Sequence, residues 1–306
     1  MSFIEALATT ARRIAKRGPY YAKAFGLMAG PVLCLRVESR GVRRSPGRLT
    51  SVALPGFAGP VWMRDTVADR SIVWQNLVRQ HYTLPSPAHD EAVMERYARG
   101  VAENRRMLVL DCGGNIGLAA IWYARLFPKA TIVTLEPDPE NFALLLRNVA
   151  PYPNIHAIQG GIWSTSGSMC IANPESGSAA FRLRHAEPGE KADVEVYSVA
   201  DICRRFDIES PFVVKIDIEG GQAALFAENT DWIAGTDLIA IELDDWLMPF
   251  QGTSQAFFRA ISQEPFDYLL GGDTLFCCRA DQTVERQARP VAPMAMMVSG
   301  EPVGAA

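Results

Sequence analysis

The chain of 306 residues is long enough for one large domain with an appendage, and its 48% apolar and 21% charged residues are typical of a folded protein. The net charge of −4 is unevenly divided: residues 1–48 hold ten Lys or Arg against two Asp or Glu, and the remainder holds 20 against 32. This acidic body excludes a general nucleic-acid binder, because neutralising phosphates requires Lys and Arg.

The cysteine pattern and the hydropathy exclude further classes of protein. The six cysteines form no CxxC pair and have no zinc-binding spacing with His, which is typical of free thiols in a reducing compartment. The most apolar stretch, residues 24–35, is much shorter than the roughly 20 residues of a membrane-spanning helix. A signal peptide also fits badly, because the basic residues lie well inside the chain. We therefore expect a cytoplasmic protein.

Residues 3–17 are predicted to form an amphipathic helix that ends at Gly18-Pro19. The apolar residues share one face, and most basic residues lie off it. Such a helix either packs on the main domain or lies on an anionic membrane, where residues 1–20 would make a peripheral contact. We favour packing, and treat residues 1–48 as a basic N-terminal extension.

Residues 48–64 are predicted to form two short strands joined by a Pro-Gly turn. The apolar spacing predicts an amphipathic helix over residues 71–84, ended by prolines, and a further helix over residues 91–104. We assign residues 49–106 to a segment that gives access to the active site of the following domain or covers it as a lid.

Short apolar strands alternate with helices from Met107 onward, which is typical of a mostly parallel sheet with helices on both faces. A closing pair of strands over residues 268–278, with a Gly-Gly-Asp turn, predicts an antiparallel edge. The predicted fold class is therefore α/β, a doubly wound and mostly parallel sheet, with an N-terminal extension of helix and β-hairpin. The strands of the parallel part are expected over residues 107–113, 131–137, 155–159, 212–217 and 238–245.

The main domain is placed at residues 107–280. Within it, residues 163–200 contain strand-like pieces and no obvious helix, which predicts an inserted β-rich ribbon or lid. Residues 281–306 are rich in Pro, Ala and Met and are expected to form a flexible tail.

Carboxylates and glycines follow the first two strands of this domain, where ligands bind in doubly wound sheets. The first strand leads into Asp111-Cys-Gly-Gly-Asn-Ile-Gly117, and the second ends in Glu136, which can accept hydrogen bonds from both hydroxyls of a ribose. The glycine spacing fits neither register of the dinucleotide fingerprint, and no Walker lysine is present. The other interpretation is an ordinary strand-to-helix turn.

Four segments, in order, resemble the FkbM-type methyltransferases, which use S-adenosylmethionine. The upstream RDTVADRSIVWQNLVRQHY resembles the start of the family's pattern, and VLDCGGNIG is similar to its D-x-G-A-N-x-G. TIVTLEPDPENF resembles the second motif, and VVKIDIEGGQAALF resembles I-K-x-D-x-E-G-x-E, with Gln222 in place of the last Glu. The resemblance covers about residues 48–279 and implies a class I, Rossmann-like fold with a seven-stranded sheet.

The resemblance also implies the residues that would bind S-adenosylmethionine. An acidic residue such as Asp111 suits the sulfonium and ammonium charges of this ligand. Trp163 falls where class I enzymes surround the adenine, and a core aromatic is the other interpretation. The expected binding residues are Asp111, Gly113, Asn115, Gly117, Glu136 and Gly161.

A hydroxyl acceptor would benefit from a general base, and carboxylates near the ends of the last two parallel strands are candidates. Of Asp217, Glu219, Glu242, Asp244 and Asp245, we select Asp217, Glu219 and Asp244 as the catalytic set. Alternatively, Asp217 and Glu219 cap the following helix, or Asp217 and Asp244 hold Mg²⁺. We assign no metal site, because no complete ligand set is visible in the sequence.

The resemblance implies O-methylation of a hydroxyl on a saccharide, a glycan intermediate or a polyketide-like metabolite. The alternative is a non-catalytic membrane-associated or scaffolding protein that keeps the fold, which Gln222 slightly supports. The acidic body disfavours a nucleic-acid methyltransferase. His81, beside Tyr82, either reaches the substrate or lies on the surface, and we prefer the surface. No oligomeric state is predicted.

Overall fold

The computed structural model describes residues 3–39, 47–171, 183–185, 190 and 192–280. The tail predicted over residues 281–306 lies outside the described residues. So do residues 1–2 and 40–46 of the N-terminal extension and parts of the predicted insertion, at 172–182, 186–189 and 191.

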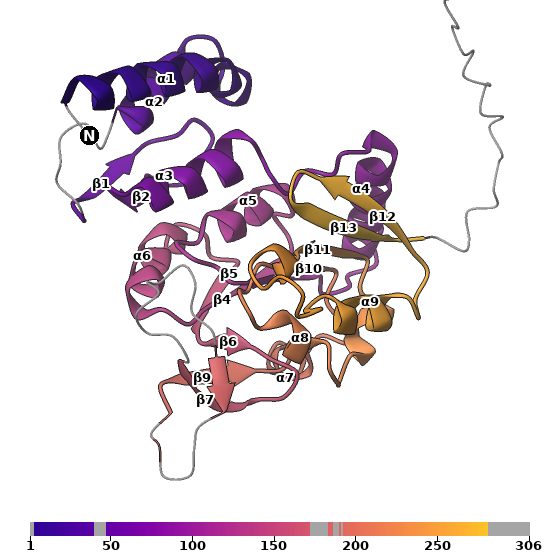
Figure 1. Ribbon diagram of the computed structural model, residues 1–306. Helices are drawn as coiled ribbons and strands as arrows, with labels where there is room; N and C mark the ends of the chain where they lie inside the picture. Colours follow the sequence, from indigo (N-terminus) through magenta and orange to yellow (C-terminus); the bar gives the residue numbers. More distant parts are fainter. Residues whose placement is uncertain (1–2, 40–46, 172–182, 186–189, 191, 281–306) are drawn as a thin grey trace, which may run out of the picture.

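A seven-stranded sheet forms the centre of the molecule (Figure 1). Its strands, in spatial order, are β12 (Phe266–Gly271), β13 (Thr274–Arg279), β11 (Leu238–Glu242), β10 (Val213–Ile216), β3 (Leu108–Cys112), β4 (Thr131–Glu136) and β5 (Ile155–Gln159). The five strands from β11 to β5 are parallel, and β13 pairs antiparallel with both β11 and β12. The structure thus confirms the predicted fold class and its antiparallel edge.

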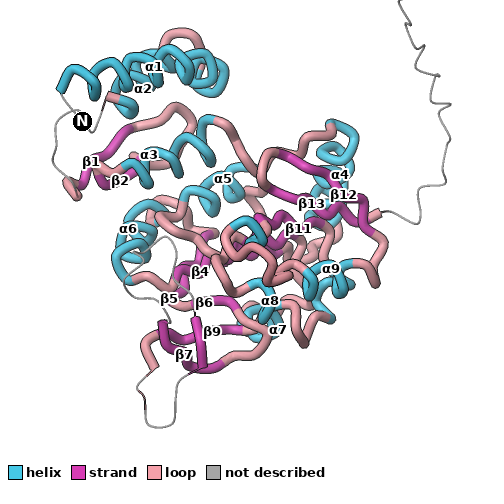
Figure 2. Tube along the Cα trace, viewed as in Figure 1, coloured by secondary structure: helices cyan, strands magenta, loops and turns pink. Residues whose placement is uncertain are grey.

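Alternate side chains of this sheet enter two separate cores. On β3, Val109 packs into one core, whereas Leu108 and Leu110 pack into the other. Because both faces are buried, these strands have nearly continuous apolar sequences. Figure 2 shows the helices on either side of the sheet. Those of the main domain, with the preceding helix, are α4 (Pro87–Ala102), α5 (Leu118–Leu126), α6 (Pro139–Val149), α7 (Val199–Arg205), α8 (Gln222–Leu225) and α9 (Gln255–Ile261).

The predicted end of the first helix is wrong. Helix α1 (Phe3–Phe25) continues through Pro19, and the break comes at Gly26, whose φ is +86°. A second helix that we did not predict, α2 (Ala29–Glu38), then folds back on α1. A proline inside a helix removes one backbone hydrogen bond and is costly, so contacts made by the rest of the helix have to compensate.

Buried Glu38 supplies such contacts. Its carboxylate forms ion pairs with Arg13 at 2.8 Å and Arg17 at 2.9 Å, and it accepts a hydrogen bond from the Tyr21 hydroxyl at 3.0 Å. These three residues lie on both sides of Pro19, so Glu38 ties both halves of α1 to α2. This long-range contact, which local sequence patterns do not reveal, accounts for the uninterrupted helix.

The segment between the extension and the main domain begins with two antiparallel strands, β1 (Leu49–Val52) and β2 (Val61–Arg64), as predicted. The following helix begins earlier and ends earlier than predicted. Helix α3 (Val67–Val73) starts at the Thr66 side chain, which caps Asp69 N, and continues into one π-helical turn, η1 (Trp74–Val78). Beyond it, Gln80 has a φ of +51° and turns the chain toward the sheet.

A second small sheet is formed by the described strands of the predicted β-rich insertion together with a short strand just before it. Its strands, in spatial order, are β6 (Gly161–Ile162), β9 (Val194–Tyr197), β7 (Gly167–Ile171) and β8 (Leu183–His185). This sheet begins directly after β5, so its first strand lies next to the carboxyl edge of the central sheet.

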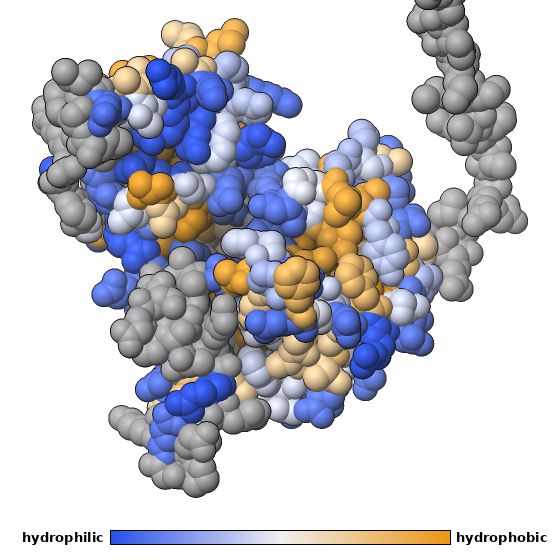
Figure 3. Space-filling model, viewed as in Figure 1, coloured by the Kyte–Doolittle hydropathy of each residue, from blue (hydrophilic) through white to orange (hydrophobic). Residues whose placement is uncertain are grey.

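The apolar face of α1 is covered only in part. Tyr21 is buried in the core and Ile14 and Phe25 pack against it, whereas Leu7, Ala8, Ala11 and Ala15 are exposed. The turn after α1 is more exposed still: Leu27 and Met28 are 86% and 91% exposed. Figure 3 shows hydrophobic atoms at this end of the helical hairpin. A peripheral membrane contact therefore remains a prediction, and both the exposed apolar residues of α1 and this turn could make it. Among the described helices, none has the length and apolar composition to cross a membrane.

Candidate active site

A cavity of about 320 Å³ opens at the carboxyl ends of β3, β4 and β10. Helix α3 and η1 supply its roof through Ala68, Ser71, Ile72 and Gln75. Six of the nine residues selected from the sequence line it: Gly113, Asn115, Glu136, Gly161, Asp217 and Glu219. These residues are distant in sequence, and the parallel strands bring them together.

The loop after β3 passes unusually close to the loop after β10. Gly113 has a φ of +83°, and a Cβ at this position would overlap the carbonyl oxygen of Asp217. Glycine is therefore required here by both conformation and space. Gly117 does not line the cavity. It precedes α5 with a φ of +86° and lies against Leu145 and Val149, so its role is in packing.

Glu136 fixes the loop after β3 while facing the cavity. Its carboxylate accepts hydrogen bonds from the backbone N–H of Asn115 at 2.7 Å and of Asp138 at 3.0 Å. Burial raises the pKa of Glu136 to about 7 despite these two bonds. Each carboxylate oxygen can accept more than one hydrogen bond, so the group can also accept bonds from a ligand.

Asp111 is fully buried and does not line the cavity. Its carboxylate lies 3.1 Å from the Lys215 ammonium and accepts a hydrogen bond from the Thr134 hydroxyl at 2.8 Å. Asp111 therefore forms a buried ion pair with Lys215 instead of the expected direct contact with a cationic ligand. Its role is to support the site from below the cavity.

Lys215 joins the ends of β3 and β10, a role that the sequence analysis missed. Its ammonium donates to the carbonyl of Gly113 at 2.6 Å and lies 3.6 Å from the Asp217 carboxylate. Although burial alone would lower the pKa of Lys215, Asp111 and Asp217 hold it above its ordinary value. The sequence does contain a signal for this role: Lys215 is a single lysine inside the apolar run VVKI, and a buried lysine requires charged or polar partners.

Asp217 has an unusual electrostatic environment. It is surrounded by protein, yet 42% of its side-chain surface remains accessible within the cavity. Burial raises its pKa to about 6, with Lys215 opposing this rise and the carboxylates of Glu242 and Asp111 adding to it. A carboxylate with this pKa is ionised at neutral pH and is a stronger base than an ordinary aspartate.

Asp244, which we had placed in the catalytic set, points away from the cavity. It lies in η4 (Asp244–Trp246), where one carboxylate oxygen accepts the Gly220 N–H at 2.9 Å and the other accepts the Gln222 side-chain amide at 3.0 Å. The same amide donates to the Glu242 carbonyl. Asp244 and Gln222 thus fix the loop that carries Asp217 and Glu219.

Gln222→Glu is expected to destabilise the protein, although it restores the residue of the family pattern. The amide now donates to two oxygens, and a carboxylate would instead face Asp244 and lose both bonds. We expect a loss of about 1–3 kcal/mol in the free energy of unfolding. The new Glu should have a raised pKa in the folded state, so the loss should grow as the pH rises above about 4.3.

Urea unfolding of the wild-type and Gln222→Glu proteins at pH 5 and pH 8 measures this effect. Gln251→Glu, on the loop after η4 and exposed, is a matched control that should change little. Equal stability of the Gln222→Glu and wild-type proteins at pH 8 would contradict the assigned hydrogen bonds.

A smaller pocket of about 60 Å³ adjoins the cavity and shares Asp217 and Glu242 with it. His81 and Tyr82 line this pocket, so the preferred surface position for His81 is wrong. The hydrogen bond to Glu242 raises the pKa of His81. Burial alone would raise the pKa of Glu242, but His81 brings it below its ordinary value. Trp163 lines the larger cavity and also belongs to a small buried cluster with Met169 and Val196, so its position agrees with both the adenine and the core interpretations.

The family comparison adds an independent result. Residues 111–264, which make up half of the chain, match the model of the Methyltransferase FkbM domain. The chain belongs to the FkbM methyltransferase family. The matched FkbM region extends from the end of β3 to the loop after α9 and includes Glu136, Asp217, Glu219 and Glu242.

Curated relatives of this FkbM protein include three methyltransferases. Methyltransferase sdnD of Sordaria araneosa is 26% identical, over 37% of this chain and 57% of its own length. The 2-O-methyltransferase NoeI of Sinorhizobium fredii is 24% identical, over 45% and 63%. The hexuronic acid methyltransferase AglP of Haloferax volcanii is 25% identical, over 44% and 54%. The chain thus spans less than two thirds of each of these relatives.

Solved structures similar to this FkbM chain include other methyltransferases. An O-methyltransferase from Bacillus cereus, in complex with SAH, is 12% identical and aligns over 69% of this chain and 89% of its own, with a TM-score of 0.36. Fibrillarin from Aeropyrum pernix is 16% identical and aligns over 60% and 74%, with a TM-score of 0.33.

Proposed function

We propose that this protein transfers a methyl group from S-adenosylmethionine to a hydroxyl of a saccharide, a glycan intermediate or a polyketide-like metabolite. The observation that carries the proposal is the joint presence of Glu136 and Asp217 in one cavity within the FkbM region. The names of two relatives, a 2-O-methyltransferase and a hexuronic acid methyltransferase, support the hydroxyl and saccharide parts.

The cavity suits S-adenosylmethionine in size and charge. Its volume of about 320 Å³ lies within the range of small-molecule sites. Asp217, Glu219 and Glu242 give the lining negative charge, which favours a ligand that carries a sulfonium and an ammonium. The buried side-chain oxygen of Asn115 has no hydrogen-bond partner among the described residues and can accept a bond from such a ligand.

When bound, S-adenosylmethionine supplies an activated methyl group, so the protein mainly has to align the donor and the acceptor. Glu136 binds the ribose hydroxyls, and the tight turn at Gly113 lets the backbone approach the ligand. Asp217 binds the acceptor hydroxyl and takes up its proton as the methyl group is transferred. The roof formed by α3 and η1 restricts the access of water to the cavity.

Glu136→Ala is expected to weaken the binding of S-adenosylmethionine by at least about tenfold, since two charge-assisted hydrogen bonds are lost. Isothermal titration calorimetry measures this affinity. Glu140→Ala, in the first turn of α6 and 84% exposed, is the matched control and should bind as the wild type does. Absence of binding to the wild-type protein would overturn the proposal.

The acceptor class is tested by measuring S-adenosylhomocysteine formation with free saccharides, lipid-linked saccharides and extracted cell glycans. Turnover with a saccharide supports the proposal. Binding of S-adenosylmethionine without turnover on any acceptor would favour the non-catalytic scaffolding alternative. A cytoplasmic location, with contact to a membrane surface through the turn at Leu27 and Met28, is part of the proposal for lipid-linked acceptors.

A further inference from the structure

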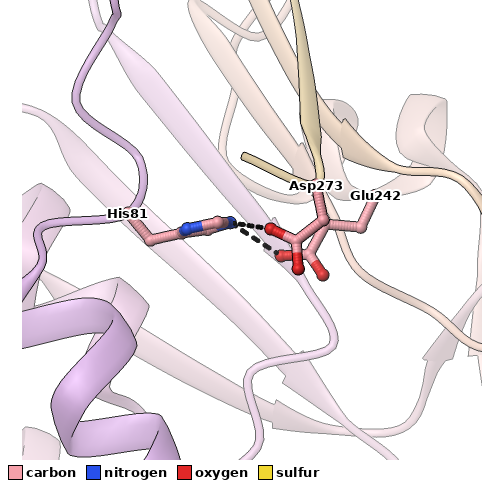
Figure 4. Close-up of side chains that lie close together, drawn as sticks. All are labelled: His81, Glu242 and Asp273. Atoms are coloured by element: carbon pink, nitrogen blue, oxygen red, sulfur yellow. Dashed lines mark ion pairs between the residues drawn. The ribbon is translucent and has the colours of Figure 1, made fainter. Parts of the chain in front are cut away.

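Three oxygen atoms surround one ring nitrogen at the edge of the smaller pocket. The Nε2 atom of His81 lies 3.0 Å from a carboxylate oxygen of Asp273, 3.3 Å from one of Glu242 and 2.6 Å from the Thr274 hydroxyl. Figure 4 shows the imidazole pointing at the two carboxylates. The residues come from the loop after η1, the end of β11 and the β12–β13 turn, so the fold brings together parts that are distant in sequence.

Hydrogen bonding explains this cluster incompletely. A protonated Nε2 carries a single N–H, which can point at only one of its three oxygen neighbours. The Thr274 hydroxyl can donate its own proton, and the Tyr82 side chain also hydrogen-bonds Glu242. Even so, the His81 Nε2 atom faces two carboxylates and a hydroxyl with a single N–H. A cation accepts lone pairs from several atoms at once, and so satisfies all of them.

The distances also match metal coordination. A metal ion that bonds nitrogen and oxygen at about 2.0–2.2 Å holds neighbouring ligand atoms roughly 3.0–3.5 Å apart. The ligand atoms of His81, Glu242 and Asp273 all lie within 4.8 Å of one another. Small shifts of side chains are therefore enough to place one ion between them.

We propose that His81, Glu242 and Asp273 form a binding site for one divalent transition-metal ion. An imidazole with two carboxylates favours Zn²⁺ or Mn²⁺ over Mg²⁺, which prefers oxygen ligands and retains its water. Three protein ligands leave coordination positions open for water or substrate. This site differs from the Mg²⁺ site considered from the sequence, since Asp244 is engaged by Gly220 and Gln222.

The position of the site gives the ion a use in catalysis. Glu242 lines both the cavity and the smaller pocket, and Asp217 lines both as well. An ion beside Glu242 would bind the acceptor hydroxyl and lower its pKa, so that Asp217 removes the proton more readily. This use rests on the proposed function, whereas binding of the ion does not.

The same hairpin contains a simple ion pair for comparison. His89 Nε2 lies 3.1 Å from a carboxylate oxygen of Asp267, and its other ring nitrogen contacts Ser86 at 2.7 Å. The described residues offer no third ligand at His89 with the spacing seen around His81. Asp267 and Asp273 have similarly exposed side chains, at 62% and 64%, so they form a matched pair for mutation.

The test measures ion binding to the full chain, purified in the presence of chelator and then dialysed. Mn²⁺ binding is followed by electron paramagnetic resonance, and Zn²⁺ and Mg²⁺ binding by calorimetry. We expect one equivalent of Mn²⁺ or Zn²⁺ for the wild type and Asp267→Asn. Asp273→Asn and His81→Gln should bind at least about tenfold more weakly. Circular dichroism verifies that each variant is folded.

Two results would overturn the proposal: a wild-type protein that binds neither ion, or an Asp273→Asn protein that binds as tightly as Asp267→Asn. Either result would mean that His81 only pairs with the carboxylates of Glu242 and Asp273 and binds no metal ion. Tight binding of Mg²⁺ alone would contradict the assigned ligand type. Because no readout depends on methyl transfer, failure of the proposed function would not change these results.

Discussion

Asp217→Asn is expected to lower kcat for methyl transfer by about 10²–10⁴-fold, the usual contribution of a general base. The amide keeps the size of the side chain but cannot accept the proton of the acceptor hydroxyl. Affinity for S-adenosylmethionine should fall far less than the rate, because Glu136 and the loop after β3 remain intact. Calorimetry and initial-rate kinetics on the same preparation separate the two effects.

The pH dependence provides a second readout for Asp217. Its pKa of about 6 means that the base form accumulates as the pH rises through this value. The kcat/KM of the wild type should therefore increase from pH 5 to pH 7 and then level off, and this rise should be absent in Asp217→Asn. Protonation of Glu136, whose pKa is about 7, would shift the curve, but the loss of rate on removing Asp217 would remain.

Asp245→Asn is the control for this experiment. Asp245 lies one residue after Asp244 and faces Thr253 and Ser254, outside the residues that line the cavity. It should retain most of the wild-type activity. Full activity of Asp217→Asn, or an equal loss in both variants, would show that Asp217 is not the base.

Lys215→Met is expected to reduce the free energy of unfolding by about 3–5 kcal/mol, the usual effect of removing one partner of a buried ion pair. The fully buried Asp111 carboxylate would lose the ammonium at 3.1 Å and keep the Thr134 hydroxyl as a neutral partner. The backbone turn at Gly113 would also lose its hydrogen-bond donor. Urea unfolding at neutral pH measures the change.

The double variant Lys215→Met/Asp111→Asn tests the cause of this loss. If the unpaired charge dominates, neutralising Asp111 should restore part of the stability. Arg106→Met removes a partner from the exposed Arg106–Asp207 pair and should have little effect. A Lys215→Met protein as stable as Arg106→Met would show that the buried pair contributes little.

The sequence predicted the central sheet well because the relevant signals are local. Short apolar runs such as LVL at residues 108–110 are buried on both faces, and each is followed by turn residues. The course of the N-terminal helix was not predictable in this way. Pro19 is a local signal for a break, whereas the opposing signal comes from Glu38, on another helix.

The site was predicted only in part, because some of its contacts follow from the sheet topology and others depend on residues distant in sequence. The carboxyl ends of parallel strands share one edge of the sheet, so Glu136 and Asp217 had to lie near each other. The alternation of side chains along a strand indicates which face of the sheet a residue occupies, but not which residue it contacts there. It could not show that Asp111 pairs with Lys215, or that Asp244 faces Gln222 instead of the cavity. The position of His81 depends on the turn at Gln80, for which no strong sequence signal exists.

The short helix η1 contacts two parts of the molecule at once. Trp74 packs against Tyr20 and Tyr21 of α1 and lies under the Arg17 guanidinium at 4.3 Å, while the adjacent Gln75 lines the cavity. The helical hairpin and the roof of the site therefore share one packed element. Any coupling carried through η1 has to be reciprocal: if binding at the hairpin changes the affinity of the cavity for its ligand, the ligand changes the affinity at the hairpin by the same factor.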